Sequence, residues 1–456
     1  FVEFQVLKMA MDHISQLPEE IKHDILSFLS MKDSIKTSVL SKRWRYQWTF
    51  NPNLDFHFNS NTYSSYQGYY EVSAINRCIN LYKPKQLHRL HINLNLHINP
   101  SKHIEAWIDF AAQRNVQQLN VMIKLEHNEY FKIPLSLLIC QSIQILRMKS
   151  CIFSPPSDFK GFPTLKILYL NHAKVEDCST LYSLLSNCPC LQRLGLLDCK
   201  FIKCLKVKTI PSLRNLSVSG IEHVEISNAP NLRYIQCSGY LQKLLVDNPP
   251  SLVTVDISLA SFVRGTQPVQ QVIKDLRPSI VSFSHVQFLS VGTYFPQLIY
   301  AECYLQRGEP IVFKNLKQFK LDGKIIDNLT LYAIVNFFSG CPVLENVTID
   351  VRFPCLHGAW ISEFMEKECV QGRLRHGFSD YLMYNLKTVR LNGFSGRAEE
   401  MMLIKVLFDK AIVLEELFLY SMMACTTGEY ELLQRLPKGS SSAKIIMENG
   451  LRLKYF

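Results

Sequence analysis

A short apolar pattern recurs along most of the chain, in which one apolar residue is followed three and five positions later by two more. Most copies lie about 20 to 30 residues apart, a period typical of repeat solenoids. Alternate residues of a strand point to the same face, so each copy predicts one short strand whose apolar side enters a shared core. The copies begin at Leu87, Val116, Ile143, Leu165, Leu191, Leu213, Leu232, Leu252, Val286, Leu316, Leu344, Leu386 and Leu414.

The longer intervals between copies have a helical pattern. Apolar residues at helical spacing predict amphipathic helices around Leu181, Ile334 and Leu403. Between Leu213 and Ile257 the copies are closer together and no helical pattern intervenes, so this stretch is predicted to be rich in β-structure. The predicted fold class is therefore α/β, with strand–helix–strand units and shorter β arcs.

Residues 12–48 have the pattern of three short helices. The first begins near Pro18, which suits a first helical turn because its missing N–H needs no partner there. Ser30, with Asp33 three residues later, is close to a capping box and marks the second start. Ser41 is placed to cap the third. A unit of about 40 residues is too small to bury all this apolar surface by itself, so part of it is expected to face a partner.

The residues of this segment resemble the F-box of plant F-box proteins. The resemblance is carried by Asp12-His13-Ile14-Ser15-Gln16-Leu17-Pro18-Glu19-Glu20-Ile21, Ile25-Leu26-Ser27-Phe28-Leu29 and Thr37-Ser38-Val39-Leu40-Ser41-Lys42-Arg43-Trp44-Arg45. In that family such positions pack against a Skp-type adaptor, which in turn binds cullin. The resemblance implies these adaptor-binding residues: Leu17, Pro18, Ile21, Ile25, Leu26, Leu29, Val39, Leu40 and Trp44.

The sequence leaves the role of two further apolar residues in this segment undecided between two alternatives. Phe28 and Ile35 lie on the same stripes, and they either face the adaptor or hold the helices together, since buried stripes usually form core. The neighbouring cations Lys42, Arg43 and Arg45 are expected on a solvated helix face or against acidic residues of a partner.

The resemblance extends through the repeats to the C-terminal end. The turns Cys188-Pro189-Cys190-Leu191 and Cys341-Pro342-Val343-Leu344 resemble those of plant F-box/leucine-rich-repeat proteins. From Leu386 the sequence resembles the FBD domain that closes many such chains, and we expect it to cap the solenoid. The predicted organisation is an N-terminal tail (residues 1–11), an F-box (12–49), a connecting segment (50–84), a leucine-rich-repeat solenoid (85–385) and an FBD-like cap (386–456).

Composition narrows the class of protein. Of the 456 residues, 47% are hydrophobic and 20% are charged, which is a globular composition. Apolar runs fall short of the ~20 residues of a membrane span, and the first residues do not have a secretory-signal pattern, so a nuclear or cytoplasmic location is expected. The fourteen cysteines are then expected as thiols. Because the chain begins with Phe1, Met9 or Met11 is the expected natural start.

The charge and the candidate chemical groups favour no catalytic or metal site. A net charge of +11 favours nucleic-acid binding only if the cations cluster, and here they are spread along the chain. Cys178, Cys188, Cys190, Cys199 and Cys204 do not have the paired spacing of a structural zinc site.

The histidines do not change this picture. His88, His91 and His97 lie on a strand-like stretch without a catalytic signature and are expected at the surface. We therefore predict no cofactor, metal or catalytic residue.

The family resemblance implies a function in target recognition. The chain is expected to be the substrate-recognition subunit of an SCF-type cullin ubiquitin ligase, binding Skp through the F-box and a target through the repeats. It would supply proximity rather than catalysis. The alternatives are an F-box protein that binds Skp outside a ligase and a basic solenoid that binds nucleic acid. A small molecule held between solenoid and target is a further alternative.

Overall fold

The computed structural model describes residues 14–449 except 59–64, 97, 99, 126–128, 157, 176–177, 209, 240, 242, 248, 259–276, 293–294, 296–298, 300–310, 324–327, 351–380 and 422–432. The predicted N-terminal tail and His97 lie outside the described residues. The chain divides into two compact units, Phe1–Ile202 and Lys203–Phe456, and the division falls inside the predicted solenoid. Among the helices described, none has the length and apolar character needed to cross a bilayer.

The N-terminal helices begin where the caps predict. Helix α2 spans Glu19–Ser27 directly after Pro18, and helix α3 spans Met31–Lys36 directly after Ser30. The Ser30 hydroxyl accepts a hydrogen bond from the Asp33 amide at 3.1 Å, so the predicted cap of the second helix is confirmed.

The predicted third helix is wrong. After the 3₁₀ turn η1 (Thr37–Val39), the chain forms turns and a second 3₁₀ turn, η2 (Gln47–Phe50). Pro52 biases the residue before it away from the α conformation, so a helix starting at Ser41 would have to end within about three turns. Trp44, Tyr46 and Trp48 lie in this stretch, and aromatic side chains lose rotamer freedom in an α-helix.

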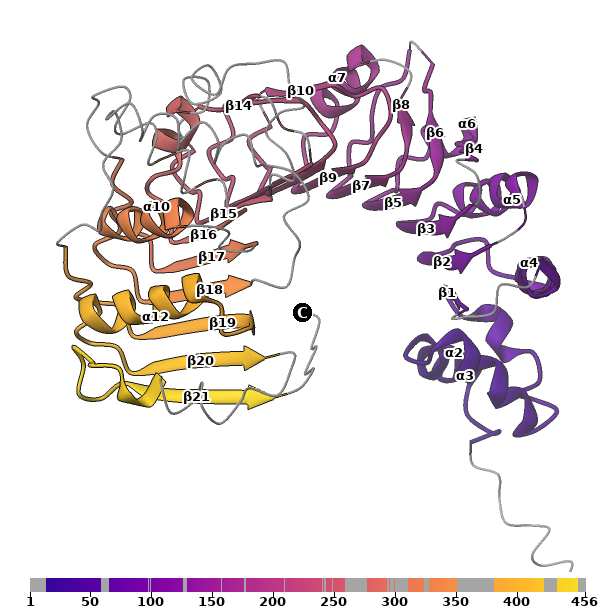
Figure 1. Ribbon diagram of the computed structural model, residues 1–456. Coiled ribbons are helices and arrows are strands. Elements are labelled where there is room, and N and C mark those ends of the chain that lie inside the picture. Colours follow the sequence, from indigo (N-terminus) through magenta and orange to yellow (C-terminus); the bar gives the residue numbers. More distant parts are fainter. Residues whose placement is uncertain are drawn as a thin grey trace, which may run out of the picture. The chain divides into compact units, whose positions relative to one another are not determined.

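In the first unit, parallel strands form a sheet in the order β1-β2-β3-β5-β7-β9 (Figure 1). Their bounds are β1 Asn53–His57, β2 Arg89–Asn95, β3 Gln118–Lys124, β5 Ile145–Lys149, β7 Ile167–Asn171 and β9 Arg193–Leu197. A smaller parallel sheet contains β4 Phe131–Lys132, β6 Cys151–Phe153 and β8 Lys174–Val175. The connections contain α4 Ser65–Leu81, α5 Ser101–Ala112, α6 Leu135–Leu138 and α7 Cys178–Ser186.

The second unit is built in the same way. Its large parallel sheet has the order β11-β13-β15-β16-β17-β18-β19-β20-β21, and a smaller sheet has the order β10-β12-β14. The strands of the large sheet are Asn215–Ser219, Tyr234–Ser238, Thr254–Ser258, Phe288–Gly292, Gln318–Asp322, Asn346–Asp350, Thr388–Phe394, Glu416–Ser421 and Lys444–Asn449. The smaller sheet contains β10 Cys204–Lys208, β12 His223–Ser227 and β14 Lys243–Val246. Helices α10 Asn328–Ser339 and α12 Ala398–Lys410 connect strands of the large sheet.

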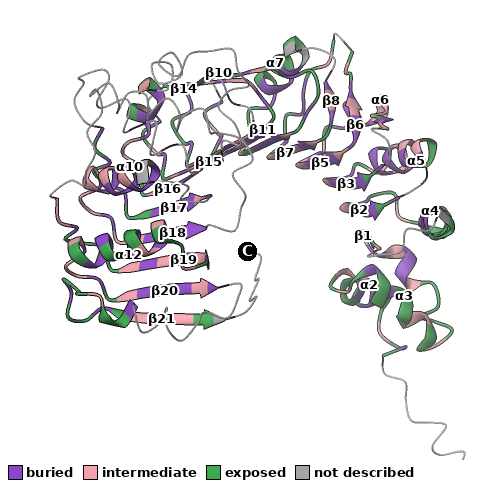
Figure 2. Cartoon of the chain, viewed as in Figure 1, coloured by how far each residue is buried: buried purple, intermediate pink, exposed green. Residues whose placement is uncertain are grey.

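The same apolar position recurs from strand to strand and forms the core. In the first unit Leu90 aligns with Leu119, Leu119 with Leu146, Leu146 with Leu168, and Leu168 with Leu194. These side chains are buried. In Figure 2 the buried residues, drawn in purple, lie along the strands of this sheet. The predicted α/β leucine-rich-repeat fold is therefore confirmed.

The predicted elements of the body match the structure closely. Each predicted copy of the apolar pattern coincides with a strand of a large sheet, and the three predicted helices are α7, α10 and α12. The predicted β-rich stretch contains strands of both sheets in alternation. The pattern did not predict β1, β21, α4 or α5. Strand β1 pairs in parallel with β2, so the predicted connecting segment contributes a strand to the repeat sheet.

Candidate functional site

Large apolar side chains are exposed on the N-terminal helices. We use the term apolar docking surface for Ile14, Ile21, Ile25, Phe28, Ile35, Val39, Leu40 and Tyr46, all of which are exposed. Phe28 and Val39 are each 87% exposed. Much of α2 and α3 is drawn as exposed in Figure 2. Exposed apolar patches of this kind mark interaction sites, because in isolation they cost solvation free energy.

The structure places the predicted adaptor-binding residues in two groups. Pro18, Ile21, Ile25, Val39 and Leu40 are exposed, and Leu17 and Leu29 are half-buried. Leu26 and Trp44 are 0% and 1% exposed, so in this chain they pack in the core beneath the surface. That these nine residues contact an adaptor stays a prediction, and for Leu26 and Trp44 the contact would be indirect.

Phe28 and Ile35, for which the sequence left two roles open, are both exposed. Neither is needed to fill the core, so both join the apolar docking surface. The sequence signal for Phe28 is its position directly after the last residue of α2, where the side chain leaves the helix stripe.

A buried amide holds the helices together. The Asn51 side chain is 0% exposed, and its Nδ2 donates hydrogen bonds to the Leu26 carbonyl (2.8 Å) and to Ser34 Oγ (3.0 Å). Asn53 Nδ2 donates to the Ser27 carbonyl (3.3 Å). The residues just before and within β1 thus satisfy carbonyl groups at the C-terminal end of α2.

Polar contacts also tie the beginning of the segment to its end. Ser15 Oγ and Ser41 Oγ are 2.7 Å apart, and His23 Nε2 lies 3.0 Å from Gln47 Oε1. The His23 ring stacks on Phe50 with 4.7 Å between the ring centroids. These contacts fix the apolar docking surface on a rigid support.

The charged residues of the segment lie at its surface. Lys42, Arg43 and Arg45 are exposed, and Arg43 Nη1 donates to the Ser15 carbonyl (3.4 Å). Hydrogen bonds from Lys36 and Ser30 lower the pKa of the Asp33 carboxyl below its ordinary value. The Lys36 Nζ to Asp33 Oδ1 distance is 2.9 Å.

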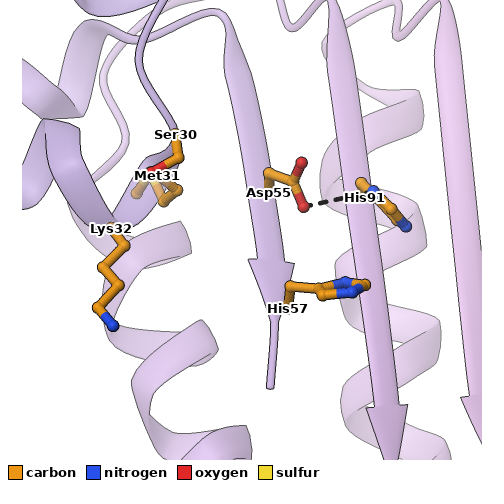
Figure 3. A pocket seen from close by; sticks show the side chains of 6 residues that line it. All are labelled: Ser30, Met31, Lys32, Asp55, His57 and His91. Carbon is orange, nitrogen blue, oxygen red and sulfur yellow. Dashed lines mark ion pairs between the residues drawn. The ribbon is translucent and has the colours of Figure 1, made fainter. Parts of the chain in front are cut away.

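A pocket of about 380 Å³ lies between α3 and the first strands (Figure 3). It is lined by Ser30, Met31, Lys32, Asp55, His57 and His91. His91 Nδ1 lies 3.3 Å from Asp55 Oδ1, and the His57 and His91 rings are 5.7 Å apart. Burial lowers the pKa of His91, and the Asp55 charge opposes this effect.

The pocket does not have the geometry of a metal site. Among the described residues, no three His, Cys, Asp or Glu side chains are placed to hold a metal ion. His88 and His91, expected at the surface, are instead half-buried, and Gln118 Nε2 lies 3.3 Å from His88 Nε2. His88 is thus part of the sheet's polar face, and His91 lines the pocket together with residues of α3.

The buried thiols are unsuited to nucleophilic chemistry. Burial raises the pKa of Cys188 and of Cys199 to about 11, and that of Cys237 to about 12. Burial also raises the pKa of Cys151 and Cys341. A thiol with a raised pKa is protonated near neutral pH and is therefore a poor nucleophile and a poor metal ligand.

Two family models match the chain. The F-box domain model matches residues 14–55, and the model described as "At1g61320/AtMIF1, LRR domain" matches residues 83–435. The first match contains every predicted adaptor-binding residue. The second contains the repeat strands from β2 to β20.

Similar proteins from Arabidopsis thaliana carry names that list the same domains. The chain is 25% identical over 451 residues to the F-box/FBD/LRR-repeat protein At1g13570, which covers 95% of this chain and 98% of the relative. It is 25% identical over 463 residues to the FBD-associated F-box protein At5g22730, covering 96% and 94%. The F-box/LRR-repeat protein At1g55660 is 31% identical over 246 residues, covering 51% and 66%. Members of such families are generally non-catalytic adaptors, and no enzyme family is indicated.

Proposed function

The chain belongs to the leucine-rich-repeat family described as At1g61320/AtMIF1 and carries an F-box, and on that premise we propose that it is the substrate-recognition subunit of an SCF-type cullin ubiquitin ligase. The F-box binds the Skp-type adaptor, and the adaptor binds cullin. The repeats bind the target protein. This function belongs to the nucleus or the cytoplasm.

The observation that supports this proposal best is the apolar docking surface. Its side chains lie within the segment that matches the F-box model, and the described part of the chain leaves each of them exposed. Covering a large apolar side chain removes it from water and is worth about 1.5–3 kcal/mol. An adaptor that covers several of them would therefore gain most of its binding free energy here.

The proposed subunit has no bond-making role of its own. It holds the target close to a ubiquitin-conjugating enzyme, and the resulting effective concentration and orientation accelerate transfer. The raised pKa of the buried thiols Cys188 and Cys199 agrees with a subunit that does not itself carry ubiquitin on a cysteine.

The direct test is the affinity of the full chain for purified Skp adaptor, measured by calorimetry. Phe28→Ala with Val39→Asp is expected to weaken binding at least about a hundredfold, because it removes two exposed anchors and adds a charge that the adaptor must desolvate. The matched control is Tyr66→Ala with Tyr70→Ala, two residues that are exposed on α4 outside the apolar docking surface. Equal affinity of both variants and the parent would refute the proposed docking surface.

A further inference from the structure

The solvent-facing side of the first unit's sheet is rich in cations. Its strands alternate buried and outward residues, and the outward positions include the cations that we call the basic sheet face: Arg89, Lys124, Arg147, Lys149 and Arg193. On strands β1, β2, β3, β5, β7 and β9 the only outward carboxylate is Asp55, and it is paired with His91 at 3.3 Å. This face therefore has excess positive charge.

Two pairs of these cations lie close enough to repel each other. Lys149 is opposite Met122 in the register, so Lys124, two residues further along β3, is its diagonal neighbour. Arg147 and Arg193 lie on either side of β7. Burial lowers the pKa of both Arg147 and Lys149, and repulsion from Arg193 and from Lys124, respectively, adds to this effect.

Four of these cations have no counter-ion among the residues that the structure describes. Within the described part of the chain none of Lys124, Arg147, Lys149 and Arg193 forms an ion pair. Among the described residues, the Arg147 guanidinium has one polar contact, the hydrogen bond from Nη1 to Asn120 Oδ1 (3.3 Å).

Some cations on strands of the second unit do have a carboxylate partner. Lys206 on β10 lies 3.5 Å from Glu225, and Lys320 on β17 lies 2.9 Å from Asp322. Asp198, just beyond β9, lies 3.9 Å from His172. The basic sheet face thus gathers several cations without a carboxylate partner among the described residues, and it can take an anion from a binding partner.

A glycine on β9, two residues after Arg193, shapes this face. Gly195 is directly opposite Tyr169, which is directly opposite Arg147. The Tyr169 ring lies so near that a Cβ at Gly195 would be 2.9 Å from Cε2 and 3.4 Å from Cγ. Glycine inside a strand is otherwise unfavourable and often marks a close approach. Here it lets the Tyr169 ring lie against β9 at Gly195, two residues after Arg193, while Tyr169 itself is opposite Arg147 on the other side.

We propose that the basic sheet face binds a phosphorylated side chain on an extended segment of the target protein, with Arg147 and Arg193 as the phosphate ligands. The inference deepens the proposed function and rests on it, because it names the chemistry of the target. Lys124 and Lys149 would contact further negative charge on the same segment.

A phosphate ester fits this face better than a carboxylate does. It carries a charge of about −1.5 to −2 near neutral pH and three acceptor oxygens, so it can satisfy two guanidinium groups at once. Guanidinium groups bind such oxygens in bidentate geometry. A single carboxylate would leave one of the two arginines without a counter-charge.

A nucleic acid fits less well. Binding along a phosphate backbone requires cations that track the strand and aromatic rings on which bases stack. Here the cations of the basic sheet face lie on strands β2 to β9 only, and Tyr169 is in contact with Gly195 rather than free to stack on both sides.

The experiment uses the full chain and a fluorescein-labelled degenerate peptide library with a fixed central phosphoserine. Libraries with serine or glutamate at that position, and a labelled DNA duplex, are measured in parallel by fluorescence anisotropy at two salt concentrations. We expect the phosphoserine library to bind at least about tenfold more tightly than the other three probes, which corresponds to one or two charge-assisted hydrogen bonds. Binding is expected to weaken with salt.

The test variant carries both Arg147→Gln and Arg193→Gln. Its matched control carries Lys203→Gln and Lys208→Gln, which change the net charge by the same amount on exposed residues around β10. We expect the arginine variant to lose at least about tenfold in affinity and the lysine control to keep it. If the arginine variant does not match the parent in thermal unfolding, Lys124→Gln with Lys149→Gln replaces it, with a loss of at least about threefold expected.

Three results would overturn the proposal: no preference for phosphoserine over serine or glutamate, unchanged affinity in the arginine variant, or equally tight DNA binding that the same variant abolishes. Skp binding is measured on the same preparations and does not depend on this face. Loss of peptide binding with Skp binding intact counts against the further inference alone, and the reverse result counts against the proposed function alone.

Discussion

Asn51 is the residue on which the packing of the N-terminal helices depends most directly. Its buried amide donates to the Leu26 carbonyl and to Ser34 Oγ, and Ser34 Oγ lies 3.4 Å from the same carbonyl. Buried polar groups that share a network stabilise a structure only while every member has its partner. One side chain thus links the end of α2, α3 and the start of β1.

Replacing Asn51 by alanine is expected to destabilise this segment by about 1–3 kcal/mol, because the Leu26 carbonyl loses a buried donor. Hydrogen exchange of the amides in α2 and α3 measures the effect. The control is Asn93→Ala, at an outward position of β2, which is expected to leave the exchange rates unchanged. Unchanged protection in the Asn51 variant would contradict the role assigned to the network.

His91 makes the stability of the pocket region depend on pH. Burial lowers its pKa below the ordinary value of 6.5, the charges of His57 and Arg89 lower it further, and Asp55 opposes them. The unfolded chain therefore binds the proton more tightly than the folded chain. This contribution of His91 to stability is present above about pH 6.5 and is lost as the pH falls below 6.5 and through the lower pKa of the folded chain.

His91→Gln removes this component, so the thermal midpoint of the variant is expected to change less than that of the parent between about pH 7 and pH 5. His172→Gln, a substitution at an exposed histidine, is the control and is expected to keep the slope of the parent. A slope as steep in His91→Gln as in the parent would exclude His91 as its source.

At this scale the sequence predicted which residues are apolar but not which side each faces. Leu26 and Phe28 are two positions apart near the end of α2, yet one is 0% and the other 87% exposed. Trp44 is buried in a turn that the helical pattern did not predict. The outward direction of a side chain depends on where a helix ends, and helix ends are the least certain feature of a periodic pattern.

At the scale of elements, the repeated strands and helices of the solenoid were predictable from the sequence, and the short irregular segments were not. The repeat strands were found because the same apolar spacing returns in every copy, and each strand buries it against its neighbours. Strand β1 was not predicted because the first apolar position of the repeat pattern, which falls in the turn before the strand, is not occupied by an apolar residue. The basic sheet face was also missed, since its cations are far apart in the sequence and are brought together only by the register.

Adjacent repeats depend on a close contact at Gly161. Its φ is +74°, and a Cβ there would lie 2.6 Å from the Asn187 carbonyl oxygen and 2.9 Å from its carbonyl carbon. Gly161→Ala is expected to cost at least about 1–2 kcal/mol, from backbone strain and from the displaced turn. Urea unfolding measures the loss.

The control for this position is Gly68→Ala in α4, where the new Cβ would meet only side-chain atoms at 3.3 Å and 3.4 Å. Alanine is favoured over glycine inside a helix by about 0.5–1 kcal/mol, so this variant is expected to be neutral or more stable. Equal effects of the two substitutions would show that the turn between repeats is not constrained as described.

At the scale of the whole molecule, each repeat contacts mainly its neighbours, so stability is spread along the stack. Leu26→Ala, which removes a fully buried side chain of the F-box, is expected to destabilise that end by about 2–5 kcal/mol. Amides of α2 and α3 should lose protection in hydrogen exchange, while those of β16 to β20 keep it. Loss of protection throughout the chain would show instead that the molecule unfolds as one cooperative unit.

The most direct test of the central claim is reconstitution of the full chain with Skp adaptor and cullin, followed by size-exclusion chromatography. The proposed function predicts a three-component complex in which cullin co-elutes with the chain only when Skp is present, and its loss in the Leu17→Ala, Pro18→Ala double variant. A stable complex with Skp that excludes cullin would contradict the ligase function and indicate a role outside it. Absence of Skp binding by the folded chain would contradict the account at its first step.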